Sequence, residues 1–144
     1  MSKLTETPQP QKISKEEINN LIYTAQQLEQ QAQQYQKQID ILNSYYTEIQ
    51  SAEQTLVELS DCEDKHNLLV PIGAGCFIYA SIQATEKVIV SIGARVHTEK
   101  NLPKAIKGIQ KKKSEIDNQL SQIKSSYNEV VERLSGIDML LKSV

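Results

Sequence analysis

The chain has 144 residues and a net charge of −2, with one Phe and no Trp. It is long enough for one ordinary domain, but its charge gives no overall basic field that would attract a nucleic acid backbone. No run of about 18 apolar residues is present, which argues against a membrane span, and the N-terminal residues lack the apolar segment of a secretory signal. We therefore expect a cytosolic protein with neither nucleic acid nor membrane as a partner.

The first segments in chain order are a tail and a long helix. Residues 1–13 are polar and are predicted to form a mobile tail. A helix is predicted over 14–60, because Ser14 can cap it while the two glutamates that follow favour the positive end of the helix dipole. Its apolar residues recur at alternating spacings of three and four up to Leu56, the pattern of a coiled-coil seam, with Glu53 as the one break. The Gln-rich stretch 26–38 is predicted to be a solvated helical face rather than a prion-like tract.

Residues 66–99 are predicted to form two β-hairpins. Four short segments rich in Val and Ile are expected to be strands, namely Asn67–Ile72, Cys76–Gln83, Lys87–Ile92 and Arg95–Glu99. Apolar residues point to both faces, so the strands need cover on both faces or closure into a barrel. One chain with two hairpins cannot supply that cover, and oligomerisation is predicted. The residues expected to mediate it are Leu69, Val70, Phe77, Ile78, Ile82, Val88, Val90 and Ile92.

The last segment, residues 101–144, is predicted to be a second coiled-coil helix. Pro103 fits its first turn, and the apolar pattern continues to the end of the chain with Lys113 as the one break. Both seams reach roughly 60 Å at about 1.5 Å per residue, and this match favours an antiparallel hairpin of the two helices. A charged seam residue lowers stability but fixes register and partner choice. An antiparallel alignment can bring Lys113 to Glu53, although the sequence alone does not fix the register.

The candidates for catalysis or metal binding are weak. They are single residues without a characteristic spacing, namely Cys62, His66, Cys76 and His97. The Gly73–Ala74–Gly75 segment is better explained as a hairpin turn than as a phosphate loop, because a strand rather than a helix follows it. The Lys111–Lys112–Lys113 cluster is expected to be a solvated helix start. No enzymatic activity, cofactor or metal is expected.

The free ends of the two helices carry more apolar residues than a two-helix seam can cover. In an antiparallel hairpin these ends are neighbours. Two interpretations remain open: the residues staple the ends or pack on a partner, or they form an exposed patch that binds other proteins. The residues are Ile13, Ile18, Leu21, Ile22, Ile137, Met139, Leu140, Leu141 and Val144.

The order helix, two β-hairpins, helix, with LVPIGAGCF at 69–77 and VSIGA at 90–94, resembles the α-type subunit of prefoldin. The resemblance covers about residues 14–144, and four strands rather than two favour the α type over the β type. The predicted fold is therefore mainly α with a small β region: a long antiparallel two-helix coiled coil joined by two β-hairpins that assemble into an oligomeric β-barrel.

The resemblance implies a heterohexamer of two α-type and four β-type subunits (α2β4), with a β-barrel body made by the hairpins and with the coiled coils as tentacles. Such complexes capture unfolded proteins at the tentacle tips without ATP and transfer them to a cytosolic group II chaperonin. The strands would then serve assembly, and the apolar residues at the helix ends would capture clients. The alternative is a structural scaffold or tether that oligomerises through its β-hairpins without binding clients.

Overall fold

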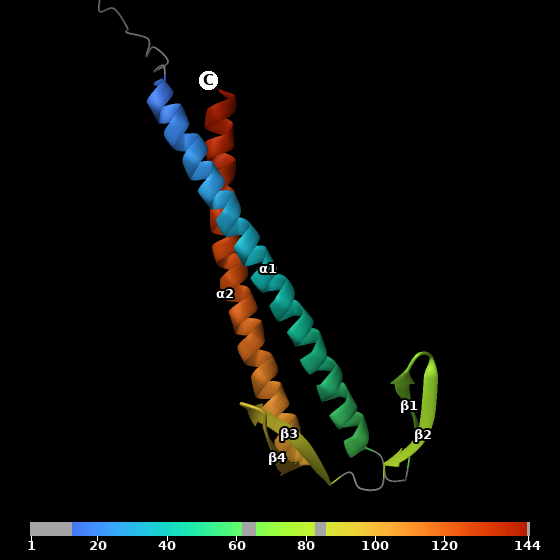
Figure 1. The fold of residues 1–144 in the computed structure, drawn as a ribbon. Helices are drawn as coiled ribbons and strands as arrows, with labels where there is room; N and C mark the ends of the chain where they lie inside the picture. The colour runs from blue at the N-terminus through green and yellow to red at the C-terminus, as the bar shows by residue number, and fades with distance from the viewer. Residues whose placement is uncertain (1–12, 62–65, 83–85, 144) are drawn as a thin grey trace, which may run out of the picture. The chain divides into compact units, whose positions relative to one another are not determined.

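The structure is a computed structural model that describes residues 13–61, 66–82 and 86–143. In chain order the elements are α1 (Lys15–Ser60), β1 (His66–Gly73), β2 (Cys76–Ile82), β3 (Lys87–Gly93), β4 (Val96–Asn101) and α2 (Leu102–Lys142), as Figure 1 shows. The predicted class, two long helices with two β-hairpins between them, is confirmed. The expected tail up to residue 12, Cys62, the Gln83 end of the second predicted strand and Val144 lie outside the described residues.

A capping box starts α1. The Ser14 N–H donates to Glu17 Oε2 over 2.7 Å, and the Glu17 N–H donates to Ser14 Oγ over 3.2 Å. Each residue thus satisfies a backbone donor that the first turn of a helix leaves without a partner. The hydrogen bond from the Ser14 N–H to the Glu17 carboxylate is the main cause that lowers the pKa of the Glu17 carboxyl. The expected role of Ser14 as the helix cap is confirmed.

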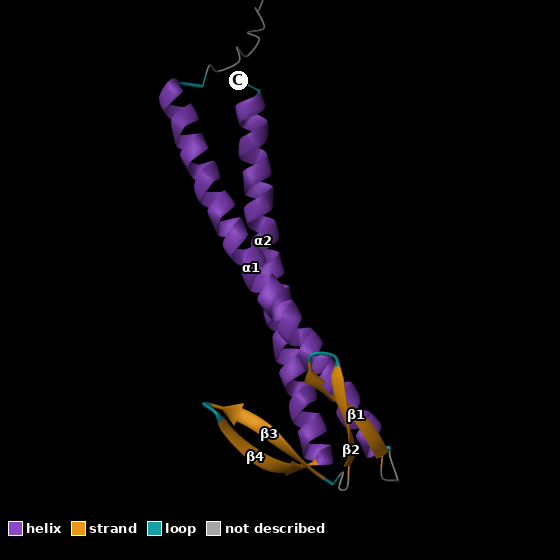
Figure 2. Ribbon diagram, turned by 45° about the vertical axis from the view of Figure 1, so that its right-hand side comes forward, coloured by secondary structure: helices purple, strands orange, loops and turns teal. Residues whose placement is uncertain are grey.

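The chain divides into two compact units, and both long helices contribute to each. The first unit takes in the residues up to Asp40 together with those from Ser121 onward. Within it α1 lies beside α2 (Figure 2). Its buried side chains are Ala25, Leu28, Ile39 and Val130, which occupy seam positions. Every Gln from residue 26 to 38 is exposed, which confirms the solvated face.

The second unit, Ile41–Leu120, holds the other part of the helix pair and both hairpins. The helix residues buried in it are Ile49, Leu102, Ala105, Ile116 and Leu120. Glu53 and Lys113, the two breaks in the apolar seams, form an ion pair between α1 and α2. This pair confirms the antiparallel alignment considered from the sequence.

The hairpins are two separate two-stranded antiparallel sheets, β1–β2 and β3–β4 (Figure 2). Both tips are built alike. The backbone has positive φ at three successive residues, Gly73–Ala74–Gly75 in one hairpin and Gly93–Ala94–Arg95 in the other, and the register shifts just before each turn. Positive φ at both central residues is typical of the type I′ turn, whose twist matches that of the flanking strands. The interpretation of residues 73–75 as a hairpin turn is confirmed.

The fourth strand differs from its predicted bounds. Arg95, expected to begin it, belongs to the turn with φ 61°. At the other end the strand continues to Asn101, because Lys87 of β3 is its partner there, and the Leu102 N–H donates to the Glu86 carbonyl over 3.0 Å. The end of β4 is thus set by pairing with β3 rather than by its own side chains, and β4 runs directly into α2.

Candidate interaction surfaces

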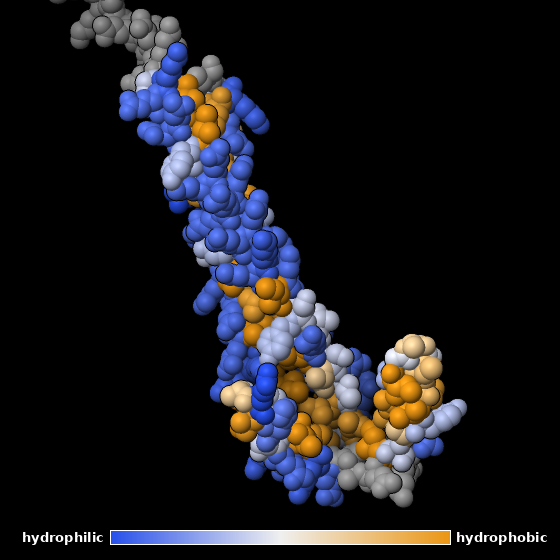
Figure 3. Space-filling model, in the orientation of Figure 1, coloured by the Kyte–Doolittle hydropathy of each residue, from blue (hydrophilic) through white to orange (hydrophobic). Residues whose placement is uncertain are grey.

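The hairpins expose apolar side chains on both faces. Of the eight residues predicted to mediate oligomerisation, Leu69, Val70, Phe77, Ile78 and Ile92 are exposed, whereas Ile82, Val88 and Val90 are half-buried. Figure 3 shows apolar surface gathered on the β1–β2 hairpin. In water such a surface is unfavourable for an isolated chain, so the hairpins are a candidate surface for contacts with other proteins.

The predicted set omitted the two most exposed apolar residues of the strands. Tyr79 is 86% exposed and Ile89 is 77% exposed. Both lie in strands that the sequence identified, and the alternation of side chains along a strand places each on the face opposite its neighbours. The alternation could therefore have identified Tyr79 and Ile89 as further members of the predicted oligomerisation set.

An apolar groove of about 890 Å³ lies within the second unit. Four elements line it: α1 with Ile49, Ala52 and Leu56, β3 with residues 88–92, β4 with Lys100, and α2 with Gly108 and Ile109. Gly108 leaves open space where a larger residue would place its Cβ. The groove therefore extends the apolar surface of β3 onto the helix pair. Apart from Val88, Val90 and Ile92, the sequence prediction did not include its lining residues.

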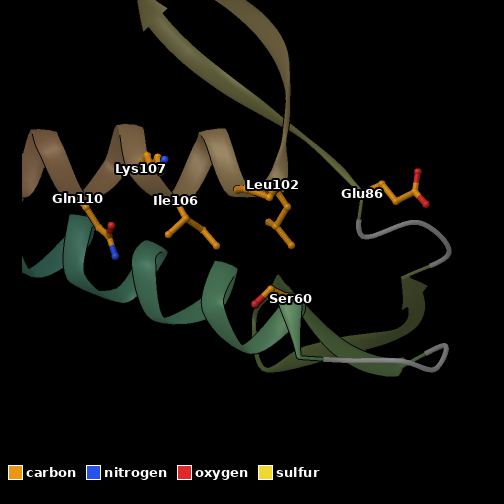
Figure 4. A pocket seen from close by; sticks show the side chains of 7 residues that line it. Ser60, Glu86, Leu102, Ile106, Lys107 and Gln110 are labelled. Atoms are coloured by element: carbon orange, nitrogen blue, oxygen red, sulfur yellow. The ribbon is translucent and has the colours of Figure 1, made fainter.

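A second, more polar pocket of about 690 Å³ lies where α2 begins. Figure 4 shows Leu102 and Ile106 on the side of α2 that faces α1, with Ser60 across from them. Glu86 and Gln110 lie at opposite ends of the view, so the polar groups do not converge on one point. Convergent polar groups are what a catalytic site needs.

The apolar residues predicted at the free ends of the helices all belong to the first unit as far as they are described. Ile22, Met139 and Leu140 are exposed, while Ile13, Ile18, Leu21, Ile137 and Leu141 are half-buried. Met139 is 67% exposed, and its flexible thioether can adapt to varied apolar partners. Ile22, Met139 and Leu140 thus leave apolar surface exposed within the first unit.

Of the residues considered from the sequence for catalysis or metal binding, the structure describes His66, Cys76 and His97. His97 is exposed, and the exposed Cys76 places its Sγ 3.9 Å from the carbonyl oxygen of Ala74. Within 13–61, 66–82 and 86–143, no group of three or more His, Cys, Asp or Glu side chains could hold a metal ion.

Over the same described ranges, no helix combines the length and apolar character needed to cross a membrane.

Comparison with known proteins identifies the family. The family model described as "Prefoldin subunit" matches residues 12–144. The chain is 32% identical over 115 residues to prefoldin subunit alpha of Thermofilum pendens, covering 80% of this chain and 89% of that protein. It is 31% identical over 122 residues to prefoldin subunit alpha of Pyrococcus horikoshii, covering 84% and 82%.

A solved structure supports the same fold. A chain of the filamentous prefoldin from Methanocaldococcus jannaschii superimposes with a TM-score of 0.68 at 17% identity, covering 81% of this chain and 97% of that one. The sequence and structural comparisons agree with the arrangement of helices and hairpins described above, and the chain belongs to the prefoldin family of chaperone subunits.

Proposed function

We propose that this chain is the α-type subunit of a prefoldin holdase, a chaperone that binds unfolded proteins without ATP. The observation that carries the proposal is the exposure of apolar side chains at two separate places, the hairpins of the second unit and the helix ends of the first. A subunit of this kind needs one surface for assembly and another for reversible capture of clients. Many weak apolar contacts suit clients of varied sequence, because none of them demands a defined partner.

In this proposal, residues 66–99 form the assembly body. The two-stranded sheets would complete a β-barrel with β-type subunits and with a second copy of this chain, in an α2β4 complex. Isolated two-stranded sheets are marginal in water, and the positions exposed on both faces, such as Phe77 and Ile78, would become buried. We further propose that the complex works in the cytosol and transfers its clients to a group II chaperonin.

The test of assembly is co-expression with a two-stranded β-type partner, followed by native mass measurement. The expected result is a complex of two copies of this chain with four of the partner. A chain that stays monomeric in the presence of each β-type partner would contradict the assembly proposal.

The test of client capture uses the assembled complex and an unrelated protein diluted from denaturant. We expect the complex to delay aggregation at stoichiometric amounts without nucleotide, and the triple variant Ile22→Ser, Met139→Ser, Leu140→Ser to lose most of that effect. The control is Ile41→Ser, which removes a comparably exposed apolar side chain, 68% exposed, from the second unit. Full suppression by the triple variant would contradict capture at the helix ends. A complex that assembles but never suppresses aggregation would favour the scaffold alternative.

A further inference from the structure

Two neighbouring lysines of α2 contact α1 within the second unit. Lys113 forms the ion pair with Glu53, and the Lys112 Nζ lies 5.3 Å from the centroid of the Tyr45 ring, within the range of a cation–π contact. These contacts join the two helices at two different turns of α1.

The Glu53–Lys113 pair is partly shielded from water. The side chains are 16% and 29% exposed, whereas those of the Lys87–Glu99 and Lys111–Glu115 pairs are at least 59% exposed. The hydrogen bond between the partners is the main cause that lowers the pKa of Glu53 and raises the pKa of Lys113. Because Glu53 and Lys113 both occupy seam positions, separating them would leave each charge facing apolar side chains.

A shifted alignment of the helices would separate Glu53 from Lys113 and leave each charge facing apolar side chains. The apolar residues of the seam, by contrast, would tolerate the shift. A slip of α1 by one heptad brings another apolar residue opposite most seam positions, so it costs little in apolar contacts. The same slip moves Glu53 opposite Ile106 or Leu120, seven residues to either side of Lys113. The ionic pair therefore distinguishes between alignments that the apolar residues treat as nearly equivalent.

The connection between the helices does not by itself fix their register. In a helical hairpin with a tight turn, the turn itself sets the alignment. Here residues 61–101, which include both β-hairpins, separate the end of α1 from the start of α2. A connection of this length leaves the choice of register to the side chains of the seam.

The same pair disfavours self-association of either helix. In a parallel, in-register pair of α1 helices from two copies, Glu53 would face Glu53. In the corresponding pair of α2 helices, Lys113 would face Lys113. Like charges at facing seam positions oppose pairing.

We propose that Glu53 and Lys113, assisted by the contact of Lys112 with Tyr45, select the antiparallel register of α1 on α2 and exclude shifted and self-paired coiled coils. Their role is thus to specify the register, because apolar residues at the same two positions would stabilise the helix pair at least as well. Replacing a shielded ion pair by apolar residues of similar volume is often stabilising, so register and stability are expected to respond in opposite directions.

The test measures register directly, by the distance between spin labels placed at Ser44 and Lys107 in the full chain. Both positions are exposed and belong to the second unit, and the native cysteines are changed to serine. On antiparallel helices the two labels are far apart along the axes, and a slip of one heptad moves one helix by about 10 Å. Dilution with unlabelled chain isolates distances within one copy. The wild-type background is expected to give a single distance.

The decisive variant is Glu53→Leu with Lys113→Leu. We expect its melting temperature to equal or exceed that of the wild type, while the label distances split into at least two populations. The charge-exchanged variant, Glu53→Lys with Lys113→Glu, should restore a single distance. The matched control, Lys111→Leu with Glu115→Leu, removes an exposed pair from α2 and should leave the distance unchanged. A single wild-type distance in the Leu–Leu variant, whatever its melting temperature, would overturn the proposal.

Discussion

Ile89→Asp is the substitution that best examines whether the hairpins are buried by partner chains. Ile89 lies in β3 and is 77% exposed. Burying a whole Ile side chain contributes about 1.5–3 kcal/mol, so burial of the exposed three quarters against a partner contributes about 1–2 kcal/mol. The aspartate removes this gain and adds a desolvated carboxylate, which costs several kcal/mol. A combined loss of about 4 kcal/mol raises the dissociation constant roughly a thousandfold.

The assay is a dilution series of the complex with a β-type partner, followed by mass measurement at each concentration. The Ile89→Asp complex is expected to dissociate at concentrations where the wild type stays assembled, with helical circular dichroism unchanged because α1 and α2 supply it. The control is Ile41→Asp, the same substitution on α1 at a residue that is 68% exposed. If the two Asp variants dissociate at the same concentration as the wild type, burial of β3 by a partner is refuted.

Three further predictions concern the chain itself. Ile39→Ala should lower the free energy of unfolding by about 2–4 kcal/mol, whereas Ile41→Ala should change it little, because the two side chains are 6% and 68% exposed; denaturant titration compares them. Glu53→Gln should lower the melting temperature at pH 7. This difference from the wild type should be fully present above pH 4.5, the ordinary pKa of Glu, and should be lost as the pH falls from there through the lowered pKa of Glu53, because the stabilisation by the pair is lost as that carboxylate protonates. Above pH 10.5, the ordinary pKa of Lys, the difference in melting temperature between Glu53→Gln and the wild type should also shrink. The pair raises the pKa of Lys113, and the stabilisation by the pair is lost as that amine deprotonates. Arg95→Gly should increase hydrogen-exchange protection in β3–β4 by the equivalent of about 0.5–1 kcal/mol, because glycine adopts the φ of 61° without a steric penalty.

The sequence predicted those features that depend on local pattern. Seam spacing identified both helices, and Glu53 and Lys113 were found as partners because a break in one apolar pattern needs a break in the other. Ala105, the most buried side chain reported at 1% exposure, was missed. The spacing of four from Leu102 to Ile106 already fitted the seam, so the alanine between them was not counted.

Other features could not be read from the sequence because they depend on tertiary geometry. The end of β4 at Asn101 follows from its pairing with Lys87, a constraint that lies outside its own residues. The groove is lined by residues of helices and strands that lie far apart in the sequence, so no local pattern predicts it. The helix ends were predicted as one apolar group, but only the structure separates the exposed Met139 from the half-buried Leu141.

The division of the strands into two separate two-stranded sheets has a consequence for turnover of the chain in the cell. A sheet of two strands opens readily, and proteases cut segments in proportion to how often they open. If partner chains bury the hairpins as proposed, a copy made in excess of its partners is expected to be cut in its strands more often than an assembled copy. The lifetime of each chain would then depend on the supply of the subunits that complete it.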